Sequence, residues 1–471
     1  MPALAAYRSR LDGLLAELAA EHHVPGAACG VLLGGESAVA TCGVANVATG
    51  TPVGPATLFQ IGSISKIYTA TLVMQAVSAG VISLDEPVRA QLQEFMVADP
   101  GATIEITPRH LLTHTSGLEG DHLIDTGWNP DALSLYVATL AGLGQIHPTD
   151  EAYSFCNTGY GVAGRLLEVA TGEHFDRVLR RRLTRPLGCP TTLTLPQHAL
   201  LHNVAVGHVQ SPGSEARRQS RWVLTRSNGP MGGIVAPPGE LLAFARMHLD
   251  RGIGADGVDL LAPAGVEAMQ QPHIEIPVPG ESQALGWTVR HWGDAVCLSQ
   301  DADTFGQRAL LRVLPERDFA VCVLANSPTG APLGQALLAR LAADLLDLSG
   351  EVLDDPQPDA EGLATPAPEA TPAELTACAG TYDRLHQRLV VTIDDGRLRM
   401  AVEPSGVLQA LGVGDAELAM TQLPITTPAA PLVFAGLDPV SGERDVAVFT
   451  PATDTQPAGL HLSGRLHRRT G

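Results

Sequence analysis

Lysine is almost missing from this 471-residue chain. Thirty residues are Lys or Arg, and Lys66 is the only lysine among them. Arginine can replace lysine wherever a solvated positive charge is enough, but a guanidinium keeps its proton. A lysine amine loses its proton when burial or a neighbouring cation lowers its pKa. The sequence therefore marks Lys66 as a candidate base, and the alternative is that the last lysine stands there by chance.

Other absences disfavour several classes of protein. A formal net charge of −20 disfavours binding to nucleic acid or to anionic membranes. The N-terminal residues read as an amphipathic helix and not as a signal peptide or a membrane span, so we expect a cytoplasmic protein. The seven cysteines have no metal-type spacing, so we expect reduced thiols and no metal. We also expect that the protein uses no organic cofactor.

Ser63 lies three residues before Lys66, in the stretch FQIGSISKIYTA (59–70). Residues 65–79 have the apolar spacing of a helix, which Gly80 ends. A hydroxyl and an amine at positions i and i+3 share one face, so the amine can take the proton of the hydroxyl. The spacing predicts a serine nucleophile at Ser63 activated by Lys66, whereas Ser65 points away and is expected to cap or pack.

Strand patterns occur at both ends of the first 348 residues, with helical patterns between them. Residues 27–34 and 37–45 predict a hairpin, and residues 284–292, 305–315 and 318–326 predict further strands. Helices are expected near residues 107–113, 157–171, 174–185, 238–252 and 333–348. This order predicts an α/β (α+β) fold, in which an antiparallel sheet flanked by helices carries a mainly helical insertion.

The remainder of the chain has a different pattern. Residues 350–373 are rich in proline, alanine and acids, which predicts a linker. Short alternating runs follow, with Asp395-Gly396 as a hairpin turn, and they predict a small β-barrel or sandwich. We therefore expect a catalytic domain over 1–349, a linker over 350–373 and a barrel over 374–471.

Several ordered motifs resemble those of the serine β-lactamase and penicillin-binding-protein superfamily, in particular its class C-like branch of esterases, D-aminopeptidases and acyltransferases. Besides S-x-x-K, they are LLTHTSGL (111–118), NTGYGVAGRLLE (157–168) and GPMGGI (229–234). The resemblance covers residues 8–348, and the tail resembles the lipocalin-like domain that some members carry. It implies a β-lactamase/transpeptidase-like fold in which Ser63 is acylated and Lys66 is its base.

Two family motifs are altered. The second, Y-x-N, falls at residues 155–157, where Asn157 matches but Phe155 replaces the tyrosine. The third, K-T-G or H-x-G, falls at residues 300–302, where the basic residue and the glycine are both missing. In the family the tyrosine relays a proton and the third-motif cation holds substrate carboxylate or orients the tyrosine. Tyr153, two residues before Phe155, is the candidate replacement for the proton relay.

The resemblance therefore implies a set of site residues. The catalytic set is Ser63, Lys66, Tyr153 and Asn157, and the substrate-binding set is Phe155, Gln300, Asp301 and Ala302. An oxyanion hole would be formed by the Ser63 N–H and one N–H from the Ala302 strand. His110, His114, Cys156 and Tyr160 are expected to be buried scaffold.

The expected function is that of a serine hydrolase or acyltransferase. It would form an acyl-enzyme from an ester, a small amide or a carrier-linked substrate, and secondary metabolism is one setting that suits it. The alternative is a catalytically impaired relative that acts as a ligand-binding or regulatory protein. The expected partners are a small-molecule or peptidyl acyl substrate and a carrier protein, with no nucleic acid and no membrane.

Overall fold

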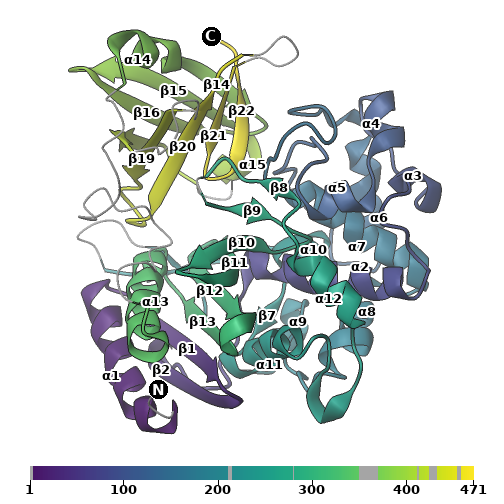
Figure 1. Ribbon diagram of the computed structural model, residues 1–471, viewed down its shortest axis with the longest axis vertical. Coiled ribbons are helices and arrows are strands. Elements are labelled where there is room, and N and C mark those ends of the chain that lie inside the picture. Colours follow the sequence, from purple (N-terminus) through teal and green to yellow (C-terminus); the bar gives the residue numbers. More distant parts are fainter. Residues whose placement is uncertain are drawn as a thin grey trace.

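The structure is a computed structural model, and it describes residues 4–209, 215–278, 280–348, 370–410, 413–423, 432–452 and 458–471. Two β-rich parts lie one above the other, with a helical region beside them (Figure 1). Of the helices in the described ranges, none is long and apolar enough to cross a membrane.

The first part is built on a nine-stranded antiparallel sheet whose strands come from both ends of residues 26–325, as the sequence predicts. The first and last strands of this segment meet in the middle of the sheet, where Ala27 lies opposite Ala325. In spatial order the strands are β3 (Thr51–Pro52), β2 (Glu36–Asn46), β1 (Gly26–Leu33), β13 (Phe319–Ala325), β12 (Gln307–Leu314), β11 (Ala295–Thr304), β10 (Thr288–Trp292), β9 (Ser282–Gln283) and β8 (Ile274–Glu275).

Helices cover both faces of this sheet. On one face pack α1 (Leu4–Glu21) and α13 (Gly330–Leu346), whose leucines recur at helical spacing; Leu11 and Leu15 of α1 are fully buried. On the other face lie α2 (Ser65–Ser78) and α11 (Pro238–Leu249), which belong to the larger core. The sheet is thus enclosed, and α2 is held against it with its N-terminus at the serine.

The helical insertion lies between β3 and β8. Its helices are α3 (Val88–Gln91), α4 (Pro100–Glu105), α5 (Pro108–Leu112), α6 (Ala132–Ala138), α7 (Asn157–Thr171), α8 (Phe175–Leu179), α9 (Pro196–Ala199), α10 (Gly229–Gly232) and α12 (Pro263–Gln270). The helix expected over 174–185 is shorter than predicted: α8 ends at Leu179 and continues as a π-helical turn over Arg180–Thr184. Pro186 follows, and its missing N–H cannot continue an α-helix.

The second β-rich part is a nine-stranded, nearly closed antiparallel sheet, so the predicted barrel is confirmed. In spatial order its strands are β17 (Ala416–Ala419), β16 (Arg397–Pro404), β15 (Gln387–Asp394), β14 (Gly380–Arg384), β22 (Arg465–Arg469), β21 (Gly459–Leu462), β20 (Arg444–Thr450), β19 (Leu432–Leu437) and β18 (Thr421–Gln422). Two short helices, α14 (Pro372–Cys378) and α15 (Gly406–Ala410), accompany it. Because α14 begins at Pro372, the last two residues of the predicted linker are helical, and most of that linker lies outside the described residues.

One turn of the barrel matters for the site. Ser463 and Gly464 both have positive φ, 47° and 78°, and they join β21 to β22 in a tight hairpin. The turn lies against the first part, because the Phe155 N–H donates to the Gly464 carbonyl (3.0 Å) and the Leu466 N–H donates to Ser154 Oγ (3.2 Å). The turn therefore places Arg465 beside Phe155.

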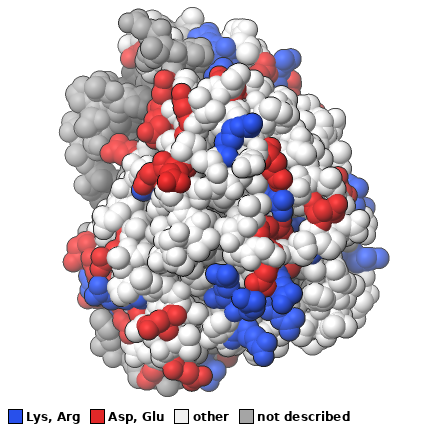
Figure 2. Space-filling model, turned by 90° about the vertical axis from the view of Figure 1, so that its right-hand side faces the viewer, with Lys and Arg blue, Asp and Glu red and all other residues white. Residues whose placement is uncertain are grey.

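Charge is unevenly distributed over the surface. Figure 2 shows Lys and Arg side chains gathered in one area of the helical side, while acidic side chains are scattered over the same face. On this side of the fold, α8 and the π-helical turn carry four arginines, at residues 177, 180, 181 and 182, and Arg185 follows the turn directly. This concentration stands out in a chain with a net charge of −20.

Candidate active site

The structure brings Ser63 and Lys66 together. A short 3-10 turn, Gly62–Ile64, leads directly into α2, so the serine precedes the first turn of the helix. Lys66 Nζ lies 3.0 Å from Ser63 Oγ and donates to the Met231 carbonyl at 2.7 Å. Lys66 has no solvent exposure. The amine is therefore held where it can receive the proton of the serine hydroxyl.

Burial decides the protonation state of this amine. Desolvation, and after it the charge of Arg465, lowers the pKa of Lys66 from 10.5 to about 7, while Asp121 acts in the opposite direction. An amine with a pKa near 7 is substantially neutral at neutral pH, and only the neutral amine can accept a proton.

Gly62 lets the serine turn approach strand β11. Its φ is +46°, and a Cβ there would lie 2.8 Å from Thr304 Cγ2 and 2.9 Å from Ala302 Cβ. The first half of β11 pairs with β10, but residues 300–304 pair with β12 alone among the residues that the structure describes. This segment therefore offers an open backbone edge next to the nucleophile, although β11 as a whole is an internal strand.

The three third-motif residues differ in their positions. Ala302 and Asp301 line the cavity at Ser63. Asp301 accepts two hydrogen bonds from the Arg312 guanidinium, at 2.5 and 3.0 Å. Gln300 is not among the lining residues, and its amide donates to the neighbouring Asp301 carbonyl (3.0 Å). None of the three supplies the cation that the family motif carries.

The second-motif residues face the same cavity. Asn157 begins α7 and donates to Asp121 Oδ1 at 2.7 Å. The ring centroid of Phe155 lies 4.6 Å from Lys66 Nζ. Both Asn157 and Phe155 line the cavity, so they are brought to the nucleophile as the motif predicts.

Tyr153 is placed differently. It is buried, its ring packs edge-on against His114 with centroids 5.7 Å apart, and it is not among the residues that line the cavity. Burial raises the pKa of its hydroxyl. The structure therefore does not bring Tyr153 into contact with the Ser63–Lys66 pair.

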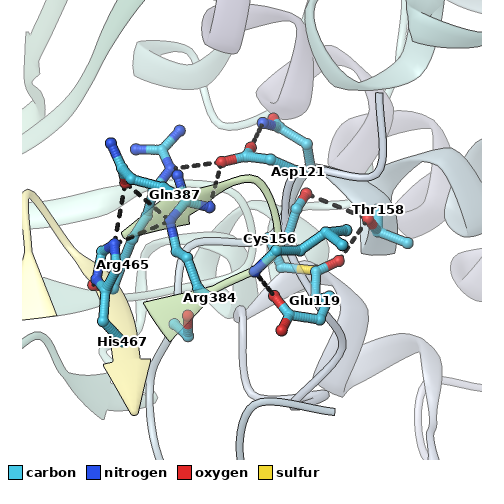
Figure 3. Close-up of polar contacts among 12 residues, drawn as sticks. Glu119, Asp121, Cys156, Thr158, Arg384, Gln387, Arg465 and His467 are labelled. Atoms are coloured by element: carbon cyan, nitrogen blue, oxygen red, sulfur yellow. Dashed lines mark hydrogen bonds and ion pairs between the residues drawn. The ribbon is translucent and has the colours of Figure 1, made fainter. Parts of the chain in front are cut away.

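Three charged residues that the sequence did not indicate complete the site. The Asp121 carboxylate is nearly fully buried and accepts hydrogen bonds from Arg384 (2.5 Å) and from Arg465 Nε (3.0 Å), as Figure 3 shows. Burial alone would raise the pKa of Asp121, but the guanidiniums of Arg465 and Arg384 outweigh it and hold the pKa well below its usual range. Both arginines belong to the barrel, which therefore contributes two cations to the site.

The cavity has a volume of about 670 Å³ and is lined by both β-rich parts. Ser63, Asn157 and Ala302 line it from the first part, and Arg384, Glu443 and Arg465 line it from the barrel. A cavity of this size can enclose a ligand of several hundred daltons.

The residues expected to be scaffold have structural partners. His114 Nδ1 accepts from the Cys156 N–H (2.9 Å), and Cys156 Sγ accepts from the Gly159 N–H (3.3 Å). Burial raises the pKa of Cys156 to about 11, which leaves its thiol protonated. Tyr160 donates to the Leu112 carbonyl (2.8 Å), and His110 Nδ1 accepts from the Thr107 N–H in a capping box. Among the residues that the structure describes, no cluster of three His, Cys, Asp or Glu side chains is placed to hold a metal.

Comparison with known proteins agrees with this fold. The chain belongs to the beta-lactamase family, whose family model matches residues 11–345. It is 37% identical over 384 residues to penicillin-binding protein 4 from Amycolatopsis lactamdurans. This alignment covers 80% of the chain and 97% of penicillin-binding protein 4. It is 24% identical over 346 residues to the unguisins hydrolase ungD' of Aspergillus campestris, covering 69% of this chain and 63% of the relative.

A similar solved structure also includes the barrel. The crystal structure of SurE matches with a TM-score of 0.74 and 28% identity, covering 99% of this chain and 100% of SurE. A structure of SurE with D-Leu matches with a TM-score of 0.71. The family relatives include hydrolases and acyltransferases.

Proposed function

We propose that this protein is a serine acyl-enzyme that hydrolyses or transfers a peptidyl acyl group. The observation that carries the proposal is the 3.0 Å contact between Ser63 Oγ and a fully buried Lys66 amine whose pKa is about 7. A serine hydroxyl is a weak nucleophile, and a neutral amine in hydrogen-bond contact is the base that it needs.

The first step is acylation of Ser63. Ser63 Oγ attacks the carbonyl carbon of the substrate while its proton moves to Lys66 Nζ. The oxyanion that forms is stabilised by the Ser63 N–H and by a backbone N–H from the open edge of β11. When the intermediate collapses, the bond to the leaving group breaks, and Lys66 returns its proton to that group.

The second step releases the acyl group. Water or an amine loses a proton to Lys66 and attacks the ester carbonyl, and Lys66 then reprotonates Ser63 Oγ. Phe155 has no proton to give, and Tyr153 lies outside the cavity lining. We therefore assign both proton transfers to Lys66.

Three observations support a peptidyl substrate with a D-residue at the acyl position. The cavity is larger than a simple ester requires. SurE, which matches this chain over both β-rich parts, has a structure with D-Leu. The cation missing from residues 300–302 has a counterpart in Arg465, which lines the same cavity.

We also propose that a carrier protein delivers the acyl group as a thioester. The support is the arginine-rich surface of α8 and the π-helical turn. Within the described residues, Arg180, Arg182 and Arg185 have no carboxylate within ion-pair distance, so this surface can receive an acidic partner. Arg226 joins α8 to the site wall: it pairs with Asp176 (2.7 Å), and it stands two residues before the cavity-lining Asn228.

Acylation of Ser63 tests the proposal. The protein is incubated with the N-acetylcysteamine thioesters of N-acetyl-D-alanine and N-acetyl-L-alanine, and with a fluorophosphonate, and its intact mass is measured. We expect covalent addition to wild type, no addition to Ser63→Ala, and faster reaction with the D-thioester. Equal rates for the two thioesters would contradict the D-residue assignment.

The alternative function is a binding or regulatory protein that has lost turnover. The observations in its favour are the altered motif positions Phe155, Gln300 and Ala302. It predicts that wild type remains unmodified by all three reagents while still binding one of the thioesters. A mass increase on wild type that is absent from Ser63→Ala would exclude it.

A further inference from the structure

The ring of Phe155 contacts two cationic groups from different parts of the molecule. Its ring centroid is 4.6 Å from Lys66 Nζ and 4.6 Å from the guanidinium carbon of Arg465. The two charges are therefore within about 9 Å of each other. Lys66 is fully buried and the Arg465 side chain is 29% exposed, so solvent screens their repulsion only in part.

The position of Arg465 is fixed by several contacts. Its Nε donates to Asp121 (3.0 Å), its guanidinium lies over Phe155, and the backbone bonds at Gly464 and Leu466 hold the hairpin turn against residues 154 and 155. The Arg465 side chain can leave this position only if its hydrogen bond to Asp121 and its contact with the Phe155 ring both break. Its charge is thus a permanent feature of the site.

The other groups around Lys66 do not supply a comparable charge. His114 follows α5 and is neutral, because its Nδ1 accepts a hydrogen bond and burial lowers its pKa well below the usual value. Asp121, in the loop after α5, is negative, but two guanidiniums share its carboxylate. The remaining groups are uncharged: the Ser63 hydroxyl before α2, the Met231 carbonyl of α10, and Phe155, Cys156 and Tyr160 at or near the start of α7.

We propose that Arg465 of the barrel is a positioning residue that keeps Lys66 in its neutral, proton-accepting form by repulsion across the ring of Phe155. Each cation is also attracted to the face of the ring. This attraction favours the protonated amine, but it acts on Arg465 too and holds that charge close to Lys66. The net direction for Lys66 is a lowered pKa, with burial as the largest cause and Arg465 next.

The consequence is that the barrel is part of the catalytic unit. Without Arg465, a larger fraction of Lys66 would be protonated at neutral pH, and a smaller fraction could accept the proton of Ser63. This consequence rests on the proposed function, but the protonation state of Lys66 can be measured independently of any activity.

Because Lys66 is the only lysine, its titration can be observed directly. The full chain is produced with lysine carrying ¹³C at the ε carbon, which yields one lysine side-chain NMR signal, and its chemical shift is followed from pH 5 to pH 11. The comparison includes wild type, Arg465→Met, Arg384→Met and Arg465→Lys, whose second lysine signal is assigned with the double variant Lys66→Met/Arg465→Lys. Arg384 is the matched control, because it contacts Asp121 but makes no ring contact with Phe155.

We expect the midpoint of wild type near pH 7 and that of Arg465→Met higher by about one pH unit or more. Arg465→Lys should keep a low midpoint, and Arg384→Met should move it less than Arg465→Met does. Asp121→Asn, which removes the opposing charge, should move the midpoint downwards, and it provides the test if Arg465→Met does not fold. An unchanged midpoint in folded Arg465→Met, or an equal rise in Arg384→Met, would overturn the inference.

The pH dependence of fluorophosphonate labelling separates this inference from the proposed function. The labelling rate of Arg465→Met should reach half of its maximum at a higher pH than the labelling rate of wild type does. The interval between these two pH values should equal the interval between the two NMR midpoints. If wild type is never labelled but the midpoints differ as expected, the proposed function fails and the role of Arg465 stands. If labelling occurs with the same pH profile in both proteins, the role of Arg465 fails and the proposed function stands.

Discussion

A buried lysine makes the stability of the fold depend on pH. The folded protein binds a proton at Lys66 with a pKa of about 7, whereas the unfolded chain binds it with the ordinary value of 10.5. Between these two values the unfolded state binds more protons than the folded state. The contribution of Lys66 to the free energy of unfolding therefore rises with pH through this window.

Replacing Lys66 by methionine should remove that dependence. We expect wild type to gain stability relative to Lys66→Met as the pH rises from about 7 to 10, by up to about 1.4 kcal/mol per pH unit. Urea unfolding of both proteins at several pH values measures the difference. Parallel stability curves for the two proteins would show that Lys66 keeps an ordinary pKa in the fold.

Lys66→Arg tests the chemistry at the same residue. A guanidinium keeps the positive charge but cannot accept a proton near neutral pH. We expect a folded protein whose labelling by fluorophosphonate is slower by about 10²-fold or more. Intact mass spectrometry against time measures the rate, and labelling as fast as that of wild type would remove Lys66 from its role as the base.

Tyr153 provides the contrasting case. The sequence marked it as a replacement for the motif tyrosine, but the structure buries it against His114, outside the cavity lining. We expect Tyr153→Phe to change the acylation rate by less than about threefold, well below the effect of removing a general acid or base. A fall of about 10²-fold without loss of fold would return Tyr153 to the mechanism.

At the scale of elements, the contact between the serine turn and β11 depends on one glycine. A Cβ at Gly62 would meet Thr304 Cγ2 and Ala302 Cβ at less than 3 Å, and the positive φ adds strain. We expect Gly62→Ala to displace the serine from the open edge of β11 and to slow labelling by about 10²-fold, the effect of losing an oxyanion-hole donor. Gly54→Ala is the control, because a Cβ there meets nothing within 4 Å. If Gly62→Ala is labelled as fast as wild type, the serine turn and β11 can move apart without slowing the acylation of Ser63.

The elements show which patterns can be predicted from sequence. The helix over residues 157–171 agrees with α7 at both ends, because its apolar period is regular and Gly172 ends it in a left-handed conformation. Residues 417–422 alternate as one continuous run, but in the structure they divide at Met420 between β17 and β18, which lie at opposite edges of the sheet. Alternation marks residues as extended without stating which neighbours they pair with, so barrel closure is settled by tertiary contacts.

At the scale of the whole molecule, the sequence indicated both parts but not their contact. Ser63, Lys66 and Asn157 follow from local motifs, whereas Arg384 and Arg465 reach the site from strands more than 300 residues after the serine. The turn SGR predicts a hairpin, and nothing in it states which surface the hairpin meets. Sites made where two domains meet are set by surface complementarity, which has no local sequence pattern.

The arginine-rich surface of α8 and its π-helical turn leads to a prediction about delivery of the substrate. A protein with a net charge of −20 repels an acidic carrier over most of its surface, so association should be steered to the area where arginines gather (Figure 2). We expect a triple variant, Arg180→Glu, Arg181→Glu and Arg185→Glu, to reduce acylation by an acidic peptidyl carrier protein loaded with N-acetyl-D-alanine by about tenfold or more at low salt. Acylation by the matching N-acetylcysteamine thioester should be unchanged, because the small substrate does not use the surface.

A second triple variant, Arg217→Glu, Arg218→Glu and Arg397→Glu, changes the net charge by the same amount at exposed residues elsewhere and is the control for net charge. Rising ionic strength should reduce the advantage of wild type, since screening weakens interactions between exposed charges. If the two triple variants lose carrier-dependent acylation equally, net charge explains the effect and the surface of α8 has no docking role.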